Sequence, residues 1–158
     1  MAEMETATRI ALVVSEYHAF VTDGLESGAR EVLAEAGFLD TAVETYLVPG
    51  AFELPQAAQR AADSGRFAAV ICLGCLIRGE TPHFDFIAQA AAHGMMRAAQ
   101  ASAVPVAFGL LTTNTVEEAI ARSTPGPSNK GRESAVAAVA MVRLYRRFNG
   151  VAEDGWDE

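Results

Sequence analysis

Short apolar runs alternate with longer amphipathic segments along the chain. Residues 10–14 (IALVV) are apolar throughout and rich in β-branched side chains, which is typical of a strand buried on both faces. The segment after it predicts a helix that Thr22 caps and Gly37 ends, because apolar residues recur on one helical face: Leu25, Ala29, Val32, Leu33 and Ala36. The pattern therefore begins with a buried strand and an amphipathic helix.

The same alternation continues to the end of the chain. It predicts strands at 42–48, 67–73 and 104–111 and helices at 52–63, 82–101, 115–123 and 131–148, joined by loops such as 74–81 and 124–129. Strands that alternate with helices indicate an α/β fold, in which helices cover both faces of a parallel sheet. Ligands of such folds bind at the carboxyl ends of the strands, so the segments to examine for chemistry are 15–18, 49–53, 74–83 and 112–114.

Composition narrows the class of protein. A chain of 158 residues with 51% hydrophobic and 20% charged residues predicts one globular domain and argues against disorder. Its net charge of −8 argues against nonspecific binding to nucleic acid or to anionic membranes, because both require a basic face. No apolar run is long enough for a membrane span, and residues 1–8 lack the apolar core of a signal peptide. We expect a cytoplasmic protein, and the surplus of apolar residues favours an oligomer.

The segment from Gly74 to Asp85 (GCLIRGETPHFD) holds the densest group of candidate residues. It leaves a buried strand and enters a helix, with Thr81 expected as the N-cap and Pro82 as the first helical residue. The free N–H groups at that helix end attract an anion such as phosphate, and the imidazole of His83 can exchange a proton with a ligand held there. The same pattern also fits a helix-capping loop that carries a surface histidine.

Other candidates stand alone, and each has a structural alternative. The Glu53 carboxylate can accept hydrogen bonds from ligand hydroxyls, or it can simply face the positive end of a helix. Tyr17, followed by His18, can stack on a planar ligand or pack at the edge of the core. Arg122 and Lys130 flank a Pro-Gly loop and can bind an anion or a carbonyl oxygen, although most such cations are only solvated.

The two cysteines, Cys72 and Cys75, have the C-x-x-C spacing of redox and zinc sites. They stand in a strand, however, where residues three apart point to opposite faces, and they do not open a helix as reactive pairs usually do. We therefore expect two reduced thiols, as in the cytoplasm, and no metal site. His93 lies in the middle of a predicted helix without an obvious partner and is interpreted as structural.

Four stretches of the sequence together resemble the 6,7-dimethyl-8-ribityllumazine synthase family. They match the family in order and spacing: VPGAFELP (48–55), LGCLIRGETPHFDF (73–86), PVAFGLLTTNTVEEAIAR (105–122) and NKGRESA (129–135). One such stretch would be suggestive, whereas four in register are specific. The resemblance covers the predicted domain, residues 8–148, which leaves a flexible N-terminus (1–7) and an acidic tail (149–158) that contains Trp156.

The resemblance implies a fold, an assembly and a reaction. The fold is a single-domain flavodoxin-like sandwich of three layers with a four-stranded parallel sheet. The assembly is a homo-oligomer built from pentamers, with active sites between neighbouring subunits and riboflavin synthase as a further partner. The reaction condenses 5-amino-6-(D-ribitylamino)uracil with 3,4-dihydroxy-2-butanone 4-phosphate to 6,7-dimethyl-8-ribityllumazine, and it releases phosphate and water. This penultimate step of riboflavin biosynthesis needs no metal and no organic cofactor.

The resemblance also implies roles for residues by their position in the sequence. His83 matches the proton donor of the family, and the phosphate site matches Glu80, Thr81 and Arg122. The site for the ribitylaminouracil matches Tyr17, Ala51, Phe52, Glu53, Cys75, Leu76 and Ile77. A neighbouring subunit would add Phe108 over the pocket and Lys130 at a uracil carbonyl, and the candidate accessory residues are His18 and Glu133.

Two departures from the family pattern accompany the resemblance. Glu16 stands where many members have arginine, and the loop 123–128 (STPGPS) replaces a segment rich in Gly, Lys and Ala. That loop influences assembly size in the family, so a pentamer, a decamer and a 60-subunit shell all remain open. A noncatalytic flavin- or lumazine-binding module and an inactive shell protein also fit the fold. A pure binder would not need His83, Thr81 and Arg122 together, so their joint presence favours the enzyme.

Overall fold

The computed structural model describes residues 8–150, and both the N-terminus (1–7) and the tail from residue 151, with Trp156, lie outside the described residues. The elements follow in the order β1 (Ile10–Ser15), α2 (Ala19–Glu35), η1 (Asp40–Ala42), β2 (Val43–Val48), η2 (Ala51–Glu53), α3 (Leu54–Asp63), β3 (Ala69–Ile77), α4 (His83–Ala101), β4 (Val106–Thr113), α5 (Val116–Ala121) and α6 (Lys130–Phe148), where η marks a 3₁₀ helix.

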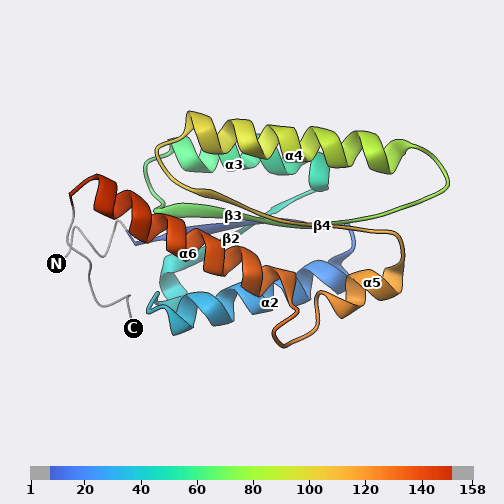
Figure 1. Ribbon diagram of the computed structural model, residues 1–158, viewed down its shortest axis with the longest axis horizontal. Coiled ribbons are helices and arrows are strands. Elements are labelled where there is room, and N and C mark those ends of the chain that lie inside the picture. The colour runs from blue at the N-terminus through green and yellow to red at the C-terminus, as the bar shows by residue number, and fades with distance from the viewer. Residues whose placement is uncertain (1–7, 151–158) are drawn as a thin grey trace.

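The strands form one parallel sheet in the order β2-β1-β3-β4. Figure 1 shows α3 and α4 on one face of the sheet and α2, α5 and α6 on the other. The predicted α/β class and the single-domain flavodoxin-like sandwich with four parallel strands are confirmed. The strand order reverses direction between β1 and β3, and the crevice beyond the carboxyl ends at such a switch point is the usual ligand site of these folds.

Alternate residues of β1 face two separate cores. Ile10, Leu12 and Val14 belong to the cluster that contains side chains of α2 and α6. Ala11 and Val13 belong to the cluster that contains side chains of α3 and α4. Every residue of β1 is buried, as a strand covered on both faces must be, and this explains why its sequence is a continuous apolar run.

Glycines allow α2 and α6 to approach each other closely. A Cβ placed on Gly131 of α6 would lie 1.9 Å from the Leu25 carbonyl oxygen of α2. A Cβ on Gly28 of α2 would lie 2.2 Å from Oδ1 of Asn129, the N-cap of α6. Asn129 is itself buried, and its side chain accepts from Arg132 N–H at 3.0 Å and donates to the carbonyl of Gly24 at 3.1 Å. The start of α6 is thereby fixed against α2.

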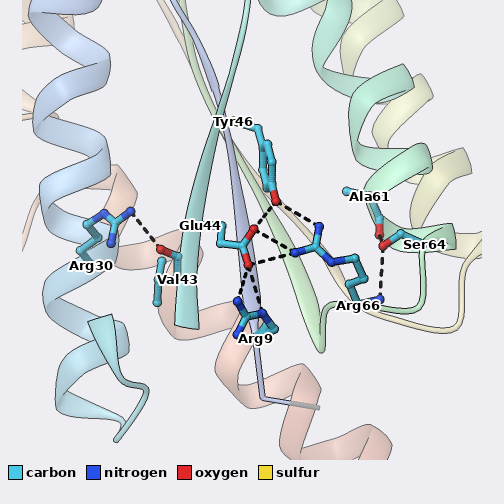
Figure 2. A network of polar contacts seen from close by, with 8 residues as sticks. All are labelled: Arg9, Arg30, Val43, Glu44, Tyr46, Ala61, Ser64 and Arg66. Carbon is cyan, nitrogen blue, oxygen red and sulfur yellow. Dashed lines mark hydrogen bonds and ion pairs between the residues drawn. The ribbon is translucent and has the colours of Figure 1, made fainter. Parts of the chain in front are cut away.

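Glu44 joins three segments at the end of the sheet opposite to the carboxyl ends of the strands (Figure 2). Its carboxylate pairs with Arg9, just before β1, at 2.9 Å and with Arg66, just before β3, at 3.2 Å. The Tyr46 hydroxyl donates to the same carboxylate. The hydrogen bond from Tyr46 and the two guanidinium groups lower the pKa of Glu44, so the carboxylate stays charged and links the edge strand β2 to the segments that precede β1 and β3.

Two predicted boundaries are corrected. Strand β3 continues to Ile77, although residues 74–77 were expected in a loop, because it keeps pairing with β4 up to Thr113. The predicted cap at Thr22 is wrong: α2 already begins at Ala19, and Thr22 is buried inside it. The carbonyl of His18 accepts the first helical hydrogen bonds, from the N–H groups of Val21 (2.9 Å) and Thr22 (3.1 Å). The predicted end of α2 at Gly37 is confirmed, since Gly37 has φ 101° directly after the cap.

Within residues 8–150, the structure has no helix with the length and apolar character that crossing a membrane requires.

Candidate active site

A pocket of about 830 Å³ opens at the carboxyl ends of the central strands. Its walls come from three consecutive strand-to-helix connections, from the end of β3, from the first turns of α4 and from the first residue of α5. The lining residues are Tyr17, His18, Pro49, Gly50, Ala51, Phe52, Glu53, Cys75, Leu76, Ile77, Gly79, Thr81, His83, Phe84, Ile87 and Val116. The volume and the mixture of apolar walls with a few polar groups are typical of a site for a small organic ligand.

The β1–α2 connection supplies a wall of aromatic rings. The Tyr17 side chain is 67% exposed, and its ring centroid lies 4.5 Å from that of His18, edge to face. Phe20 of α2, which does not line the pocket, also contacts His18 edge to face, with ring centroids 5.7 Å apart. His18 adopts φ 64°, a left-handed conformation that is uncommon for residues with a side chain and is often found at functional sites. Burial lowers the pKa of His18, which favours a neutral imidazole between the two rings.

The β2–α3 connection supplies Ala51, Phe52 and Glu53 as the short helix η2. The helix that was predicted from residue 52 is thus divided into η2 and α3, with Pro55 in the first turn of α3. Phe52 is 55% exposed beside the pocket. No group within residues 8–150 forms a hydrogen bond with the Glu53 carboxylate, so its oxygens are available to hydroxyl or amide donors of a ligand.

The β3–α4 connection places His83 at the mouth of the pocket. Cys75, Leu76 and Ile77 line the pocket as the last residues of β3. Pro82 is the N-cap of α4 and His83 its first residue, one position later than predicted. The Thr81 hydroxyl nevertheless accepts from the N–H of His83, at 3.4 Å. The open N-terminus of α4 therefore meets a histidine and a hydroxyl in the same pocket, an arrangement that suits an anionic ligand group.

Five of the sequence-predicted site residues do not line this pocket: Glu80, Phe108, Arg122, Lys130 and Glu133. Glu80 is exposed on the β3–α4 loop, and Phe108 lies on the edge strand β4 with 43% of its side chain exposed. Arg122 follows α5 and donates to the carbonyl of Glu118 at 3.1 Å. The Lys130 N–H donates to the Arg122 carbonyl at 2.8 Å, and the Lys130 ammonium pairs with Glu133 at 3.1 Å. Arg122, Lys130 and Glu133 thus form one group at the α5–α6 connection.

Several lining residues were missed by sequence reasoning. Phe84 and Ile87 follow His83 in α4, and Val116 begins α5. Phe84 and Ile87 read in the sequence as ordinary core positions of a helix, and Val116 carries no polar group that would draw attention. Their contribution is shape, which only the packing of α4 and α5 at the sheet edge reveals. Within the described part of the chain, no cluster of three or more His, Cys, Asp or Glu side chains has a geometry that could hold a metal ion.

Comparison with known proteins decides the family. The family model described as 6,7-dimethyl-8-ribityllumazine synthase matches residues 7–146. The chain belongs to this family. A relative from Caulobacter vibrioides, named 6,7-dimethyl-8-ribityllumazine synthase 1, is 50% identical over 140 residues, which cover 89% of this chain and 92% of the relative. Lumazine synthases from Chlorobium phaeobacteroides and Desulfatibacillum aliphaticivorans are 48% and 41% identical, each covering 89% of this chain and 90% of the relative.

Membership of the lumazine synthase family makes the chain an enzyme of the transferase class in riboflavin biosynthesis. Two of the four stretches that carried the resemblance run from the end of a strand into the following helix, and a third, 105–122, contains all of β4 and α5. Three of them contribute residues to the pocket, and the fourth, NKGRESA, begins α6 beside Arg122. The lumazine synthase pattern in the sequence is therefore chiefly a pattern of strand ends and helix starts.

Proposed function

We propose that the chain condenses 5-amino-6-(D-ribitylamino)uracil with 3,4-dihydroxy-2-butanone 4-phosphate to give 6,7-dimethyl-8-ribityllumazine, phosphate and water. The observation that carries this proposal is the joint presence in one pocket of exposed aromatic rings, a carboxylate, an open helix N-terminus and a histidine. These are the groups that a planar ring, a polyol chain, a phosphate and a proton transfer require.

The proposed roles follow the chemistry of each group. Tyr17 and Phe52 offer rings against which the uracil can stack, and Glu53 accepts from the ribityl hydroxyls. The Thr81 hydroxyl and the N-terminus of α4 hold the phosphate of the second substrate. His83 moves protons as the imine forms, the phosphate leaves and the second ring closes. Holding amine and ketone together can lower the barrier by about 7–11 kcal/mol in favourable cases. One acid–base group is then enough to supply the rest of the rate enhancement.

We further propose that the working form is a homo-oligomer built from pentamers with shared active sites. Phe108, Arg122 and Lys130 do not line the pocket of their own chain. Phe108 and Arg122 are exposed, and Lys130 is partly exposed. Arg122 and Lys130 are adjacent, so both would reach the same pocket of a neighbouring subunit. The cytoplasm is the proposed location, and riboflavin synthase, which would consume the product, is the proposed partner.

The reaction can be followed directly. We expect the purified protein to accelerate the appearance of lumazine absorbance well above a protein-free control, because the two substrates condense slowly unaided. His83→Ala should reduce kcat by about 10²–10⁴-fold while the ribitylaminouracil still binds, since its role is proton transfer. His93→Ala is the matched control, because His93 lies on α4 outside the pocket. No acceleration by the wild-type protein, combined with tight lumazine binding, would identify a binding module instead.

A further inference from the structure

Arg78 follows β3 and lies beside the pocket but not in its lining. Its N–H donates to the carbonyl of Thr113 at 2.9 Å, which continues the pairing of β3 with β4 by one residue. Its side chain then turns to two other segments. Nε donates to Oδ1 of Asn114 at 3.0 Å, and Nη1 pairs with the Asp85 carboxylate at 3.3 Å. The guanidinium also stacks over the Phe84 ring, with Cζ 4.5 Å from the centroid.

These contacts join two walls of the pocket. Phe84 and Asp85 directly follow His83 in the first turn of α4. Asn114 begins the turn that leads to Val116, the pocket residue at the start of α5. That turn is rigid on its own, because Glu118 accepts from the N–H groups of Asn114 (2.7 Å) and Thr115 (3.2 Å) in a capping box. Arg78 therefore ties the helix end that carries His83 to the turn that begins α5.

The His83 segment has few other anchors. Residues 78–83 are exposed, and a Cβ built on Gly79 would meet no atom within 4 Å. Within residues 8–150, the other side-chain hydrogen bond of this loop is the one between Thr81 and the His83 N–H, which is long at 3.4 Å. Phe84 is the buried anchor of the first turn, and it is the ring that Arg78 covers. The position of His83 thus depends on a few contacts, several of which involve one guanidinium.

We infer that Arg78 is a positioning residue that holds His83 in place for catalysis. This inference rests on the proposed role of His83. A planar guanidinium can donate in two directions within one plane while its face covers an aromatic ring, and a lysine ammonium cannot combine these contacts. A displacement of about 1 Å at a reacting group can reduce the rate by about 10²-fold. A residue outside the pocket that holds His83 in place, here called a brace, can therefore control turnover.

Kinetics of Arg78→Gln test the inference. We expect kcat to fall about 10–100-fold and the KM for the ribitylaminouracil to stay within about twofold, because the ring site is untouched. Arg78→Lys should remain impaired. Arg132→Gln is the matched control: Arg132 also pairs with two carboxylates, Glu31 at 2.8 Å and Glu35 at 3.2 Å, and it does not line the pocket of its chain. A wild-type kcat in Arg78→Lys would show that charge alone matters and would overturn the inference.

Substitution of the residues that Arg78 contacts distinguishes a positioning role of Arg78 from direct binding of the phosphate. If Arg78 acts through its contacts, Asp85→Asn and Asn114→Ala should each lower kcat. The double variant Arg78→Gln with Asp85→Asn should then have nearly the same kcat as Arg78→Gln alone. If Arg78 instead binds the phosphate itself, its loss raises the KM for the butanone phosphate at unchanged kcat, and the two partner variants have no such effect. The second result would replace the positioning role by a binding role.

Hydrogen exchange provides a readout that does not depend on the reaction. Arg78→Gln should speed the exchange of backbone amides in residues 79–86 relative to the wild-type protein, and Arg132→Gln should not. Faster exchange in a protein that makes no lumazine would support the brace and refute only the proposed function. An active wild-type enzyme whose kcat and exchange are both unchanged in Arg78→Gln would refute the brace and leave the proposed function intact.

Discussion

Cys72 and Cys75 illustrate at the scale of single residues how a sequence pattern can mislead. They have the spacing of a redox pair, yet Cys72 lies in the core under α3 and α4 and Cys75 in the core under α2 and α6. The prediction that they face opposite sides of the sheet is confirmed. Burial raises the pKa of Cys72 to about 12 and that of Cys75 to about 11, so both thiols stay protonated at neutral pH.

These pKa values predict slow reaction with thiol reagents in the folded protein. At pH 8 the Cys75 thiol lies three pH units below its pKa of about 11, so only about one molecule in a thousand carries the reactive thiolate. We expect a chromogenic disulfide reagent to label neither cysteine of the native protein within minutes and both after denaturation. The rate at which Cys75 is labelled in the native protein should still increase with pH at about pH 10, because the pKa of this thiol is about 11.

The control for this experiment is Ser27→Cys on the exposed side of α2. Its thiol should react quickly at pH 8, and its rate should level off near the ordinary pKa of a free thiol, about 8.5. Equally fast labelling of Cys75 in the native protein would mean that the carboxyl end of β3 is open to solvent.

At the scale of elements, the sequence pattern predicts the order and type of the strands and helices, because each buried strand needs an apolar run and each helix an apolar face. It fails where the chain turns. The end of β3 at Ile77 depends on continued pairing with β4, and the start of α2 depends on the left-handed His18. Residue types alone do not encode either feature, because the first is a tertiary contact and the second is a left-handed conformation that only a few per cent of non-glycine residues adopt.

The contact between α2 and α6 gives a prediction with a clear sign. In an isolated helix, Gly131→Ala would favour folding by about 1 kcal/mol. Here the added Cβ would lie 1.9 Å from the Leu25 carbonyl oxygen and 2.6 Å from its carbon, both backbone atoms that cannot rotate away. We expect α2 and α6 to be forced apart, with a loss of about 1–3 kcal/mol in the free energy of unfolding measured by urea denaturation.

Gly79→Ala serves as the control for Gly131→Ala, because its Cβ would enter open space. Its free energy of unfolding should stay within about 0.5 kcal/mol of the wild-type value. A Gly131→Ala variant as stable as the wild type would show that the start of α6 can shift relative to α2 without cost.

At the scale of the whole molecule, the site residues divide into two groups. Tyr17, Glu53, Thr81 and His83 meet in one pocket, and they lie where the carboxyl ends of the parallel strands direct them. Phe108 and Lys130 lie elsewhere on the same chain. The sequence could predict the first group because strand order and strand ends place its members together. The second group joins no pocket of its own chain, and the order of strands and helices in one chain does not encode the contact with a neighbouring subunit that the proposed oligomer would give it.

Complementation between two inactive variants tests whether sites are shared between subunits. His83→Ala removes the proposed proton carrier of the pocket, and Lys130→Ala removes a cation at the α5–α6 connection. If each site combines His83 of one chain with Lys130 of its neighbour, a ring of randomly mixed chains holds both residues in about a quarter of its sites. Unfolding and refolding the two variants together at equal amounts should therefore restore about a quarter of the wild-type kcat, although each variant alone is nearly inactive.

The same mixture without joint refolding is the control, since separately assembled rings cannot exchange partners and should stay inactive. The pairing of variants also matters. Mixing His83→Ala with Thr81→Ala should restore nothing, because Thr81 and His83 line the pocket of the same chain and every mixed site then lacks one of them. Recovery only in the His83 and Lys130 mixture would place the two residues on different subunits of one site. Failure to recover in a verified mixed oligomer would mean that each chain builds its site alone, and that Lys130 acts on its own pocket through a movement of the α5–α6 connection.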